Sequence, residues 1–299
     1  MNQMVEVASV LLRMARPSHL LLIAFIYLLG ATMAMALGAV FDAQLLLFGL
    51  VVLLIVSSSV HYANEYADYE TDALTKRTLF SGGSGALPGS TVNRRVALRA
   101  AWVSLTAGSM LALVGWAAGA LNTTALFLLV LGTFLGWMYS LPPMALAWKG
   151  WGELDNAVIG GMALPLFGFA ALAGPIDLPV AAACAPFVAL VFLNLLATTW
   201  PDREADAAVG KRMLATRWSP ARLRWLYWAV AALFFLMFPL LVGWSIPPRV
   251  AWSSYLVAPL VILGGYLYTR SRSPLPSVAA MITMAVVQFG AWLSLLAGS

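Results

Sequence analysis

Nine apolar runs, each close to 20 residues long, follow one another along the 299-residue chain. A helix needs about 20 apolar residues to cross the hydrocarbon core of a bilayer, and it satisfies its backbone hydrogen bonds within itself. The runs therefore predict an all-α integral membrane protein with nine transmembrane helices in one bundle. Their approximate bounds are 18–38, 44–66, 95–118, 122–140, 153–174, 178–200, 222–243, 250–269 and 276–297.

The composition supports a membrane protein and excludes most soluble classes. Hydrophobic residues make up 62% of the chain and charged residues only 10%, whereas soluble domains carry about 25% charged residues. The net charge of +5 does not indicate nucleic-acid binding, because the basic residues are spread over the loops of one membrane side. The single cysteine, Cys184, excludes an internal disulfide bond.

The basic residues predict the orientation of the chain. With nine spans, every Lys and Arg except Arg249 falls near the N-terminus or in and beside the loops that follow the second, fourth, sixth and eighth spans. All of these lie on one side of the membrane. Loops rich in Lys and Arg stay in the cytoplasm, so we expect the N-terminus inside and the C-terminus outside. Most acidic residues lie on the same side, so we expect the site to face the cytoplasm. We expect the membrane to be the cell (inner) membrane of a bacterium or an archaeon.

Two acidic motifs close apolar runs in this weakly charged chain. Asn64, Asp68 and Asp72 are spaced four residues apart, as are Asp202 and Asp206. Residues i and i+4 share one helix face, so each motif predicts a polar stripe. Carboxylates near a bilayer are candidates for function, and Mg²⁺ binds to one or two carboxylates together with substrate phosphates. The motifs therefore predict a magnesium site for a diphosphate, with Asn64 contributing an amide oxygen.

A basic pair follows each motif. Each pair either reflects the excess of basic residues in cytoplasmic loops or binds diphosphate oxygens. The three glutamates beside the motifs lie off the stripes and are expected to face solvent. The basic residues are Lys76, Arg77, Lys211 and Arg212, and the glutamates are Glu65, Glu70 and Glu204.

The two motifs also indicate an internal repeat. Asp68 and Asp72 recur as Asp202 and Asp206 at an offset of 134 residues, and a basic pair recurs beside them. Repeats in membrane proteins often place the site at their interface. We therefore expect a single domain, 1–299, built from two four-helix pseudo-repeats at about 18–140 and 153–269 and a ninth helix.

Several other polar residues belong to the same predicted face. The Ser81–Gly85 segment is either a backbone anion nest or a flexible loop that closes over a site. Tyr139 and Lys149 are candidates for substrate binding. Arg16 is either part of a helix start, with Pro17 in the first turn, or a substrate ligand. His61 is expected to be a hydrogen-bonded interior residue.

Taken together, these motifs resemble the UbiA superfamily of intramembrane prenyltransferases. The resemblance covers nearly the whole chain, and the residues that carry it are Arg16-Pro17, Asn64/Asp68/Asp72, Tyr139 with Pro142-Pro143, Gly152-Glu153, and Asp202/Asp206 with Gly210-Lys211-Arg212. It implies a helical bundle around a central cavity, with both Asp motifs at the cytoplasmic mouth. It also implies that Mg²⁺ bridges the Asp residues to an isoprenyl diphosphate.

One departure concerns loop 4–5. Many members of the superfamily carry Tyr and Lys four residues apart, whereas here Leu-Pro-Pro143 follows Tyr139-Ser and the next lysine is Lys149. The resemblance implies an aromatic acceptor of the prenyl group, with 1,4-dihydroxy-2-naphthoate preferred and 4-hydroxybenzoate second. The alternatives are terpene cyclisation, transfer to a glycerol lipid or transfer of a phosphoribosyl group. A cation-coupled transporter fits less well, because the acids lie at span ends.

Overall fold

The chain forms a helical bundle in which nine segments are long and apolar enough to cross a membrane, counted over the residues that the structure describes. The structure is a computed structural model that describes residues 3–75, 77 and 82–297. The predicted fold class and the nine spans are confirmed. The spans are α2 (Pro17–Ala36), α3 (Ala43–Ala67), α5 (Arg95–Ala117), α6 (Thr123–Ser140), α8–η1–α9 (Gly152–Ala173), α10–α11 (Leu178–Thr199), α14 (Pro220–Leu241), α15–η2–α16 (Pro248–Leu267) and α17 (Leu275–Leu296).

Three of the spans are interrupted. The fifth contains a π-helical turn, η1 (Ile159–Ala163), between α8 (Gly152–Val158) and α9 (Leu164–Ala173). The sixth breaks at Cys184 between α10 (Leu178–Ala183) and α11 (Ala185–Thr199). The eighth passes from α15 (Pro248–Ser253) through the 3₁₀ turn η2 (Ser254–Val257) into α16 (Ala258–Leu267). The sequence predicted each of these spans as one helix.

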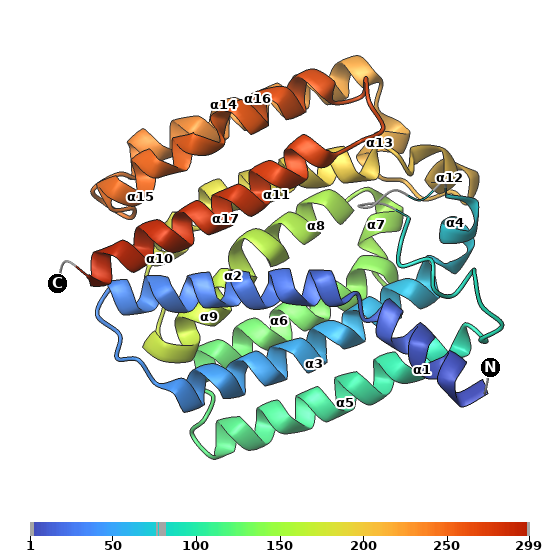
Figure 1. The fold of residues 1–299 in the computed structure, drawn as a ribbon, viewed down its shortest axis with the longest axis horizontal. Helices are drawn as coiled ribbons and strands as arrows, with labels where there is room; N and C mark the ends of the chain where they lie inside the picture. The colour runs from blue at the N-terminus through green and yellow to red at the C-terminus, as the bar shows by residue number, and fades with distance from the viewer. Residues whose placement is uncertain (1–2, 76, 78–81, 298–299) are drawn as a thin grey trace.

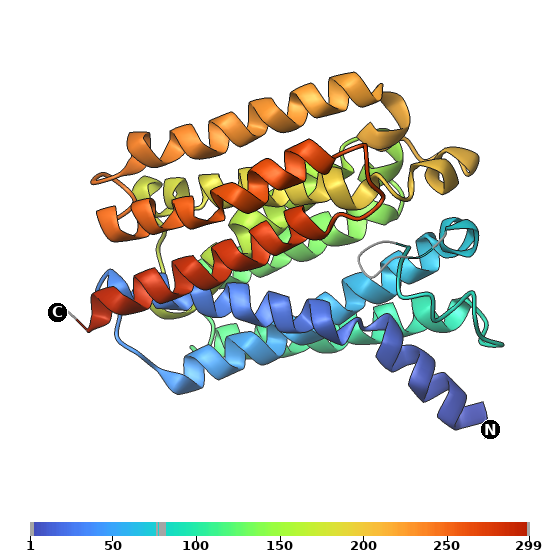
Figure 2. The ribbon, with the colours of Figure 1, turned by 45° about the horizontal axis from the view of Figure 1, so that its top comes forward.

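Short helices gather at one end of the bundle. The long helices run along a common direction, and the short ones lie where the polar motifs end their spans (Figure 1). The N-terminal helix projects from this same end, whereas the C-terminus lies at the opposite end (Figure 2). These short helices, which lie outside the nine spans, are α1 (Gln3–Met14), α4 (Tyr69–Leu74), α7 (Leu146–Lys149), α12 (Arg203–Ala208) and α13 (Leu214–Arg217).

Side-chain caps define where several spans begin. Asp42 accepts hydrogen bonds from the backbone N–H groups of Gln44 and Leu45, and Asn122 and Asp177 cap α6 and α10. Such caps satisfy the free N–H groups of the first turn. They explain why these spans start within a few residues of the predicted bounds.

Close backbone contacts hold the helices around the cavity. A Cβ atom added at Gly168 in α9 would collide with the backbone oxygen of Tyr27 in α2, and one at Gly30 would collide with that of Pro165. Small residues allow such approaches between membrane helices. The α2–α9 pair is therefore fixed by glycine on both sides.

Candidate active site

The first acidic motif lies where the second span ends. Helix α3 ends at Ala67 and α4 begins at Tyr69, with Asp68 between them. The backbone N–H of Asp68 donates to the Asn64 carbonyl at 2.8 Å, and that of Asp72 donates to the Asp68 carbonyl at 2.8 Å. Because the i to i−4 hydrogen bonds continue through the break, the predicted stripe keeps its helical spacing.

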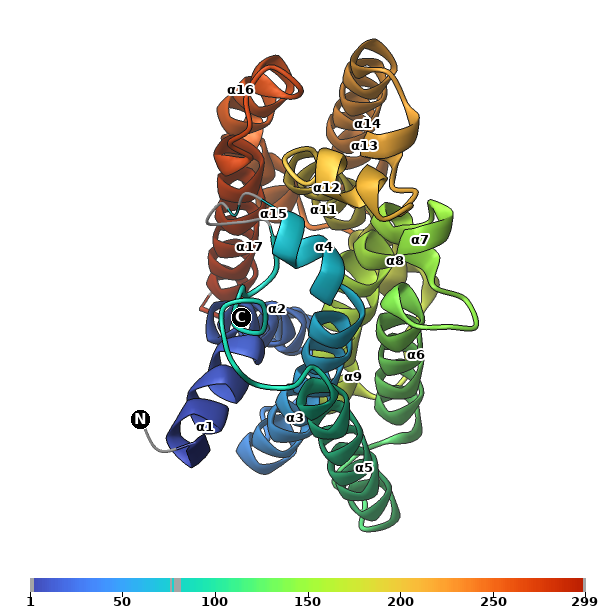
Figure 3. The same ribbon diagram turned by 90° about the vertical axis from the view of Figure 1, so that its right-hand side faces the viewer.

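The second motif repeats this local design after the sixth span. Asp202 precedes α12, and the backbone N–H of Asp206 donates to the Asp202 carbonyl at 2.9 Å. The backbone N–H of Lys211 donates in turn to the Asp206 carbonyl at 2.9 Å, which turns the chain back toward the site. Helices α4 and α12 lie side by side at this end of the bundle (Figure 3). The fold thus brings the two motifs together.

Lys211 joins the two motifs electrostatically. Its Nζ lies 3.1 Å from Oδ1 of Asp68 and 3.7 Å from Oδ1 of Asp206, and only 9% of its side chain is exposed. Burial by itself would lower the pKa of the Lys211 ammonium, but the nearby carboxylates raise it above its ordinary value. Lys211 is therefore held as a cation between the motifs.

Two carboxyl groups of the site have raised pKa values. Burial, together with repulsion from Asp68 and Glu65, raises the pKa of Asp72 to about 7. Burial also raises the pKa of Asp206 to about 6, despite the opposing charge of Lys211. A carboxylate that is buried beside other carboxylates is stabilised by added positive charge. The site therefore favours a further cation.

A glycine-rich segment crosses the site between the motifs. The backbone N–H of Gly82 donates to Oδ2 of Asp202 at 3.1 Å. Gly83 has a φ of +61°, and a Cβ atom added there would collide with the carboxylate of Asp72. Only glycine adopts this conformation without strain and leaves that space free. Of the predicted Ser81–Gly85 loop, Ser81 lies outside the described residues, and the rest packs across the site.

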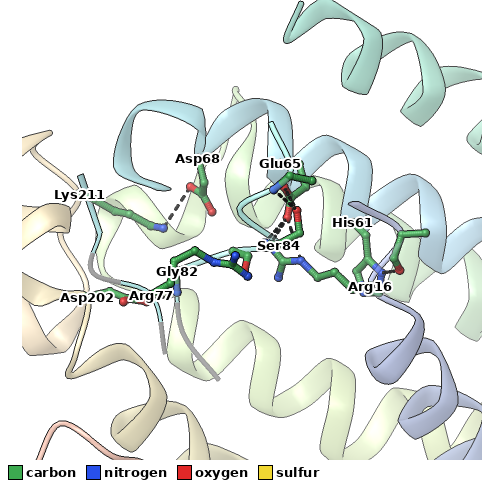
Figure 4. A network of polar contacts seen from close by, with 12 residues as sticks. Arg16, His61, Glu65, Asp68, Arg77, Gly82, Ser84, Asp202 and Lys211 are labelled. Atoms are coloured by element: carbon green, nitrogen blue, oxygen red, sulfur yellow. Dashed lines mark hydrogen bonds and ion pairs between the residues drawn. The ribbon is translucent and has the colours of Figure 1, made fainter. Parts of the chain in front are cut away.

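The expectation that Glu65 faces solvent is wrong. Its side chain is only 1% exposed, and it accepts hydrogen bonds from Nε and Nη2 of Arg16 at 3.0 and 2.6 Å. It also accepts from the backbone N–H and Oγ of Ser84 at 2.9 and 2.6 Å (Figure 4). Helical periodicity identified the face of α3 that carries Asp68 but could not show that Arg16 and the glycine-rich segment cover the neighbouring face. The rule that a carboxylate near a bilayer is a functional candidate, applied to Glu65 itself, would have identified it.

The outcome for the other residues beside the motifs is mixed. Glu70 and Glu204 are exposed, as predicted, with 72% and 66% of their side chains accessible. Nδ1 of His61 lies 2.7 Å from the Ala15 carbonyl, which agrees with the prediction of a hydrogen-bonded interior histidine.

The motifs open into a cavity of about 580 Å³. This volume lies in the range of about 300–1,000 Å³ that is typical of small-molecule sites. Apolar side chains such as Leu22, Leu128 and Phe167 line much of the wall. The predicted site residues that line it are Arg16, Asn64, Asp68, Asp72, Tyr139, Asp202, Asp206 and Lys211.

The remaining predicted residues do not line this cavity. Arg77 is exposed and donates to the Gly83 carbonyl at 3.3 Å. Lys149 is exposed and donates to the Pro143 carbonyl at 3.0 Å. Arg212 is exposed beside the buried Lys211. None of the three lines the cavity, and Lys76 lies outside the described residues.

The donor set fits Mg²⁺ bound together with a ligand. Oδ1 of Asn64 and Oδ2 of Asp72 are buried and accept no hydrogen bond from the described residues. Within the same part of the chain, no three acidic, histidine or cysteine side chains gather closely enough to hold a metal by themselves. Mg²⁺ usually takes one or two carboxylates and completes its shell with water and substrate phosphates. The separated motifs match that pattern.

A nine-span bundle with two acidic motifs at the mouth of an apolar cavity defines a class of membrane-embedded helical protein whose polar site opens into an apolar cavity. The model of the UbiA prenyltransferase family matches residues 23–287. The chain therefore belongs to the UbiA prenyltransferase family and is an integral membrane protein. No curated protein sequence matches the chain.

Several solved structures share the fold. A UbiA homologue from Archaeoglobus fulgidus bound to GPP and Mg²⁺ superposes with a TM-score of 0.68 at 16% identity, covering 96% of this chain and 99% of that one. A digeranylgeranylglyceryl phosphate synthase gives 0.67 at 16% identity, covering 98% of each chain. The apo structure of a homologue from Aeropyrum pernix K1 gives 0.64 at 19% identity, covering 91% and 96%. At these identities the likeness establishes the fold.

Proposed function

We propose that the chain transfers a prenyl group from an isoprenyl diphosphate to a small acceptor within the membrane. The observation that carries this proposal is the arrangement of two acidic motifs and the buried Lys211 at the mouth of a long apolar cavity. Homologues of this fold hold GPP or DMAPP together with Mg²⁺. The mouth suits the diphosphate, and the apolar wall suits the isoprenoid chain.

The acidic residues would hold Mg²⁺. Asp68, Asp72, Asp202 and Asp206 supply carboxylates and Asn64 an amide oxygen. Bound Mg²⁺ neutralises the charge that develops on a departing diphosphate. Lys211 lies between the motifs and Arg16 lines the mouth, so both are placed to donate hydrogen bonds to diphosphate oxygens. Tyr139 forms the adjoining wall.

The proposed reaction is an alkyl transfer. The bond between the allylic carbon and the diphosphate oxygen breaks, and the diphosphate leaves with the electron pair. A nucleophilic ring carbon of the acceptor forms a bond to the allylic cation, and the ring proton is transferred to an oxygen of the departed diphosphate. Apolar side chains keep water from the cation, and the charged residues at the mouth stabilise the leaving group.

For the acceptor we propose an aromatic quinone precursor, with 1,4-dihydroxy-2-naphthoate preferred and 4-hydroxybenzoate second. The second candidate is a glycerol lipid, favoured by the structural likeness to digeranylgeranylglyceryl phosphate synthase. A cation-coupled transporter is disfavoured, because the carboxylates lie where the spans end and not at mid-span.

We propose that the site faces the cytoplasm, with the N-terminus inside and the C-terminus outside. The two ends of the chain lie at opposite ends of the bundle (Figure 2), and the basic residues gather at the end that carries the motifs. The positive-inside rule assigns that end to the cytoplasm.

The test uses the purified protein in lipid nanodiscs with labelled geranylgeranyl diphosphate, Mg²⁺ and a panel of acceptors. Excess chelator should abolish prenylation. Asp68→Asn and Asp202→Asn should each lower the rate by about 100-fold or more, because each removes a carboxylate that would hold the Mg²⁺ that stabilises the leaving group. Glu70→Gln is the matched control, since Glu70 is 72% exposed beside the same motif. Full activity in chelator, or equal losses in Glu70→Gln and Asp68→Asn, would overturn the proposal.

A further inference from the structure

A buried amide lies deep in the cavity, away from the charged mouth. Asn194, in α11, is 9% exposed and lines the cavity. Its Oδ1 is buried and accepts no hydrogen bond from the described residues. An unsatisfied buried polar atom costs about 1–3 kcal/mol. The chain therefore carries an unfavourable feature at a position that an apolar side chain would fill well.

The position of Asn194 indicates what meets it. Asn194, Thr198 and Asp202 follow one another at steps of four residues and all line the cavity. Helix α11 ends at Thr199, so at a rise of 1.5 Å per residue Asn194 lies about 8 Å before the end of the helix, and Asp202 follows after a turn. A diphosphate bound at Asp202 therefore lies closer to the mouth than Asn194 does. The amide borders the part of the cavity that lies beyond the diphosphate.

A second amide lies on the neighbouring helix. Asn156, in α8, also lines the cavity, and α8 packs against α11. One turn later the π-helical turn η1 begins, and a Cβ atom added at Gly161 would meet the backbone of Val188 in α11 at 2.5 Å. Single π-helical turns inside α-helices occur frequently at functional sites. The irregular span thus brings two amides to a wall that is otherwise largely apolar.

We propose that Asn194 and Asn156 form a hydrogen-bonding subsite for a hydroxyl group of the acceptor. This inference rests on the proposed prenyl transfer. The buried Oδ1 of Asn194 needs a hydrogen-bond donor, which a hydroxyl group supplies and a hydrocarbon chain does not. The amides are uncharged, whereas the basic residues Arg16 and Lys211 lie at the mouth. The subsite therefore selects a neutral hydroxyl, and any carboxylate of the acceptor points away from it.

The test compares Asn194→Leu with the wild type, because leucine keeps the approximate shape of asparagine and removes the acceptor atom. The acceptors are a hydroxylated aromatic acid, its methyl ether and a glycerol lipid. A site built to bind a hydroxyl rejects analogues that lack it. We expect kcat/KM of the wild type for the hydroxylated acceptor to exceed that of the variant by about 10- to 100-fold. The preference for hydroxyl over methyl ether should disappear in the variant.

Binding of the donor substrate separates this subsite from the site at the mouth. Titration calorimetry with geranylgeranyl diphosphate and Mg²⁺, without acceptor, should give the same affinity for Asn194→Leu and the wild type, within about twofold. The control variant is Thr133→Val. Thr133 also lines the cavity, but its Oγ1 donates to the Leu129 carbonyl at 2.6 Å within its own helix. This variant should keep the hydroxyl preference.

Three results would overturn the subsite. The first is an unchanged hydroxyl preference in Asn194→Leu, and the second is an equal loss of preference in Thr133→Val. The third is a loss of diphosphate affinity in Asn194→Leu that matches its loss of kcat/KM. If the wild type bound no prenyl diphosphate at all, the proposed function would fail as well, and the calorimetry would show this before any acceptor is added. A preference for the glycerol lipid that depends on Asn194 would assign the hydroxyl to that source.

Discussion

Glu65→Gln is the most informative substitution that the structure suggests. The side chain of Glu65 receives four hydrogen bonds, two from Arg16 and two from Ser84. It therefore joins the start of α2 to the glycine-rich segment that crosses the acidic motifs. Glutamine keeps the length and shape of the side chain but removes the negative charge that pairs with Arg16.

The magnitude follows from burial and from the number of contacts. Opening of the segment separates Ser84 from Glu65, and a hydrogen bond to a charged group contributes about 1.5–3 kcal/mol, against about 0.5–1.5 kcal/mol for a neutral one. The Glu65 side chain is 1% exposed, so both hydrogen bonds from Ser84 lose strength when the buried charge is removed. The amide oxygen of glutamine also retains part of the hydrogen bonding. We expect the glycine-rich segment to open more easily by about 2 kcal/mol, which corresponds to about 30-fold in the opening equilibrium.

The assay measures that opening with a buried thiol. Ala86 is 0% exposed, and its backbone N–H donates to Oγ of Ser84 at 3.1 Å. In a Cys184→Ala background, Ala86→Cys should react with a polar thiol reagent only when the segment opens. Glu65→Gln should raise the labelling rate by about 30-fold.

Glu70→Gln is the control for this measurement. Glu70 contacts Arg94 at 3.4 Å in an exposed pair, and such pairs contribute about 0–1 kcal/mol. Its labelling rate should change by less than about fivefold. An unchanged rate in Glu65→Gln, or an equal rise in Glu70→Gln, would refute the role of the buried Glu65 carboxylate in holding the segment.

Three further predictions concern the charged mouth of the cavity and the orientation of the bundle. Lys211→Met should lower the prenylation rate by about 10-fold or more, because a charge facing the leaving group is lost; an unchanged rate would exclude Lys211 from the site. Gly83→Ala should weaken Mg²⁺ binding, measured by calorimetry, because its Cβ displaces a motif carboxylate. Gly210→Ala has a similar positive φ and open space around it, so it should leave Mg²⁺ binding unchanged. Single cysteines at Ser219 and at Val40, which is 85% exposed, should react with an impermeant thiol reagent from the cytoplasmic and the outer side respectively. Labelling from the same side would contradict the orientation.

The number of spans followed from the sequence because a single physical demand determines it. A segment that crosses the bilayer needs enough apolar residues to fill its thickness, and this demand acts on each segment separately. The interruptions at η1 and η2 each precede a proline, Pro165 or Pro259, which removes an i to i−4 hydrogen bond, whereas the close approach of two backbones depends on a neighbouring helix. Gly161 tolerates the close backbone of Val188, and no pattern within its own span reports that neighbour.

The same distinction separates the site residues that were predicted from those that were missed. The spacing of Asp68 and Asp72 indicated one helical face, and the cavity lies against that face. The burial of Glu65 depends on Arg16, 49 residues earlier. Whether Lys149 reaches the cavity depends likewise on the path of its loop. The sequence shows that these residues share one side of the membrane but not which neighbours they meet.

The balance of charge at the mouth makes metal and diphosphate binding depend on each other. The four motif aspartates line the cavity, whereas Arg16 and Lys211 are the Arg and Lys residues of the described chain that do so. A diphosphate alone would therefore meet more negative than positive charge, and its affinity must rise when a divalent cation is present. By thermodynamic linkage, the diphosphate raises the affinity for the cation by the same factor. The raised pKa values of Asp72 and Asp206 reflect the same excess of carboxylates. The motif carboxylates and the diphosphate thus both need positive charge nearby. Lys211 alone supplies only part of that charge.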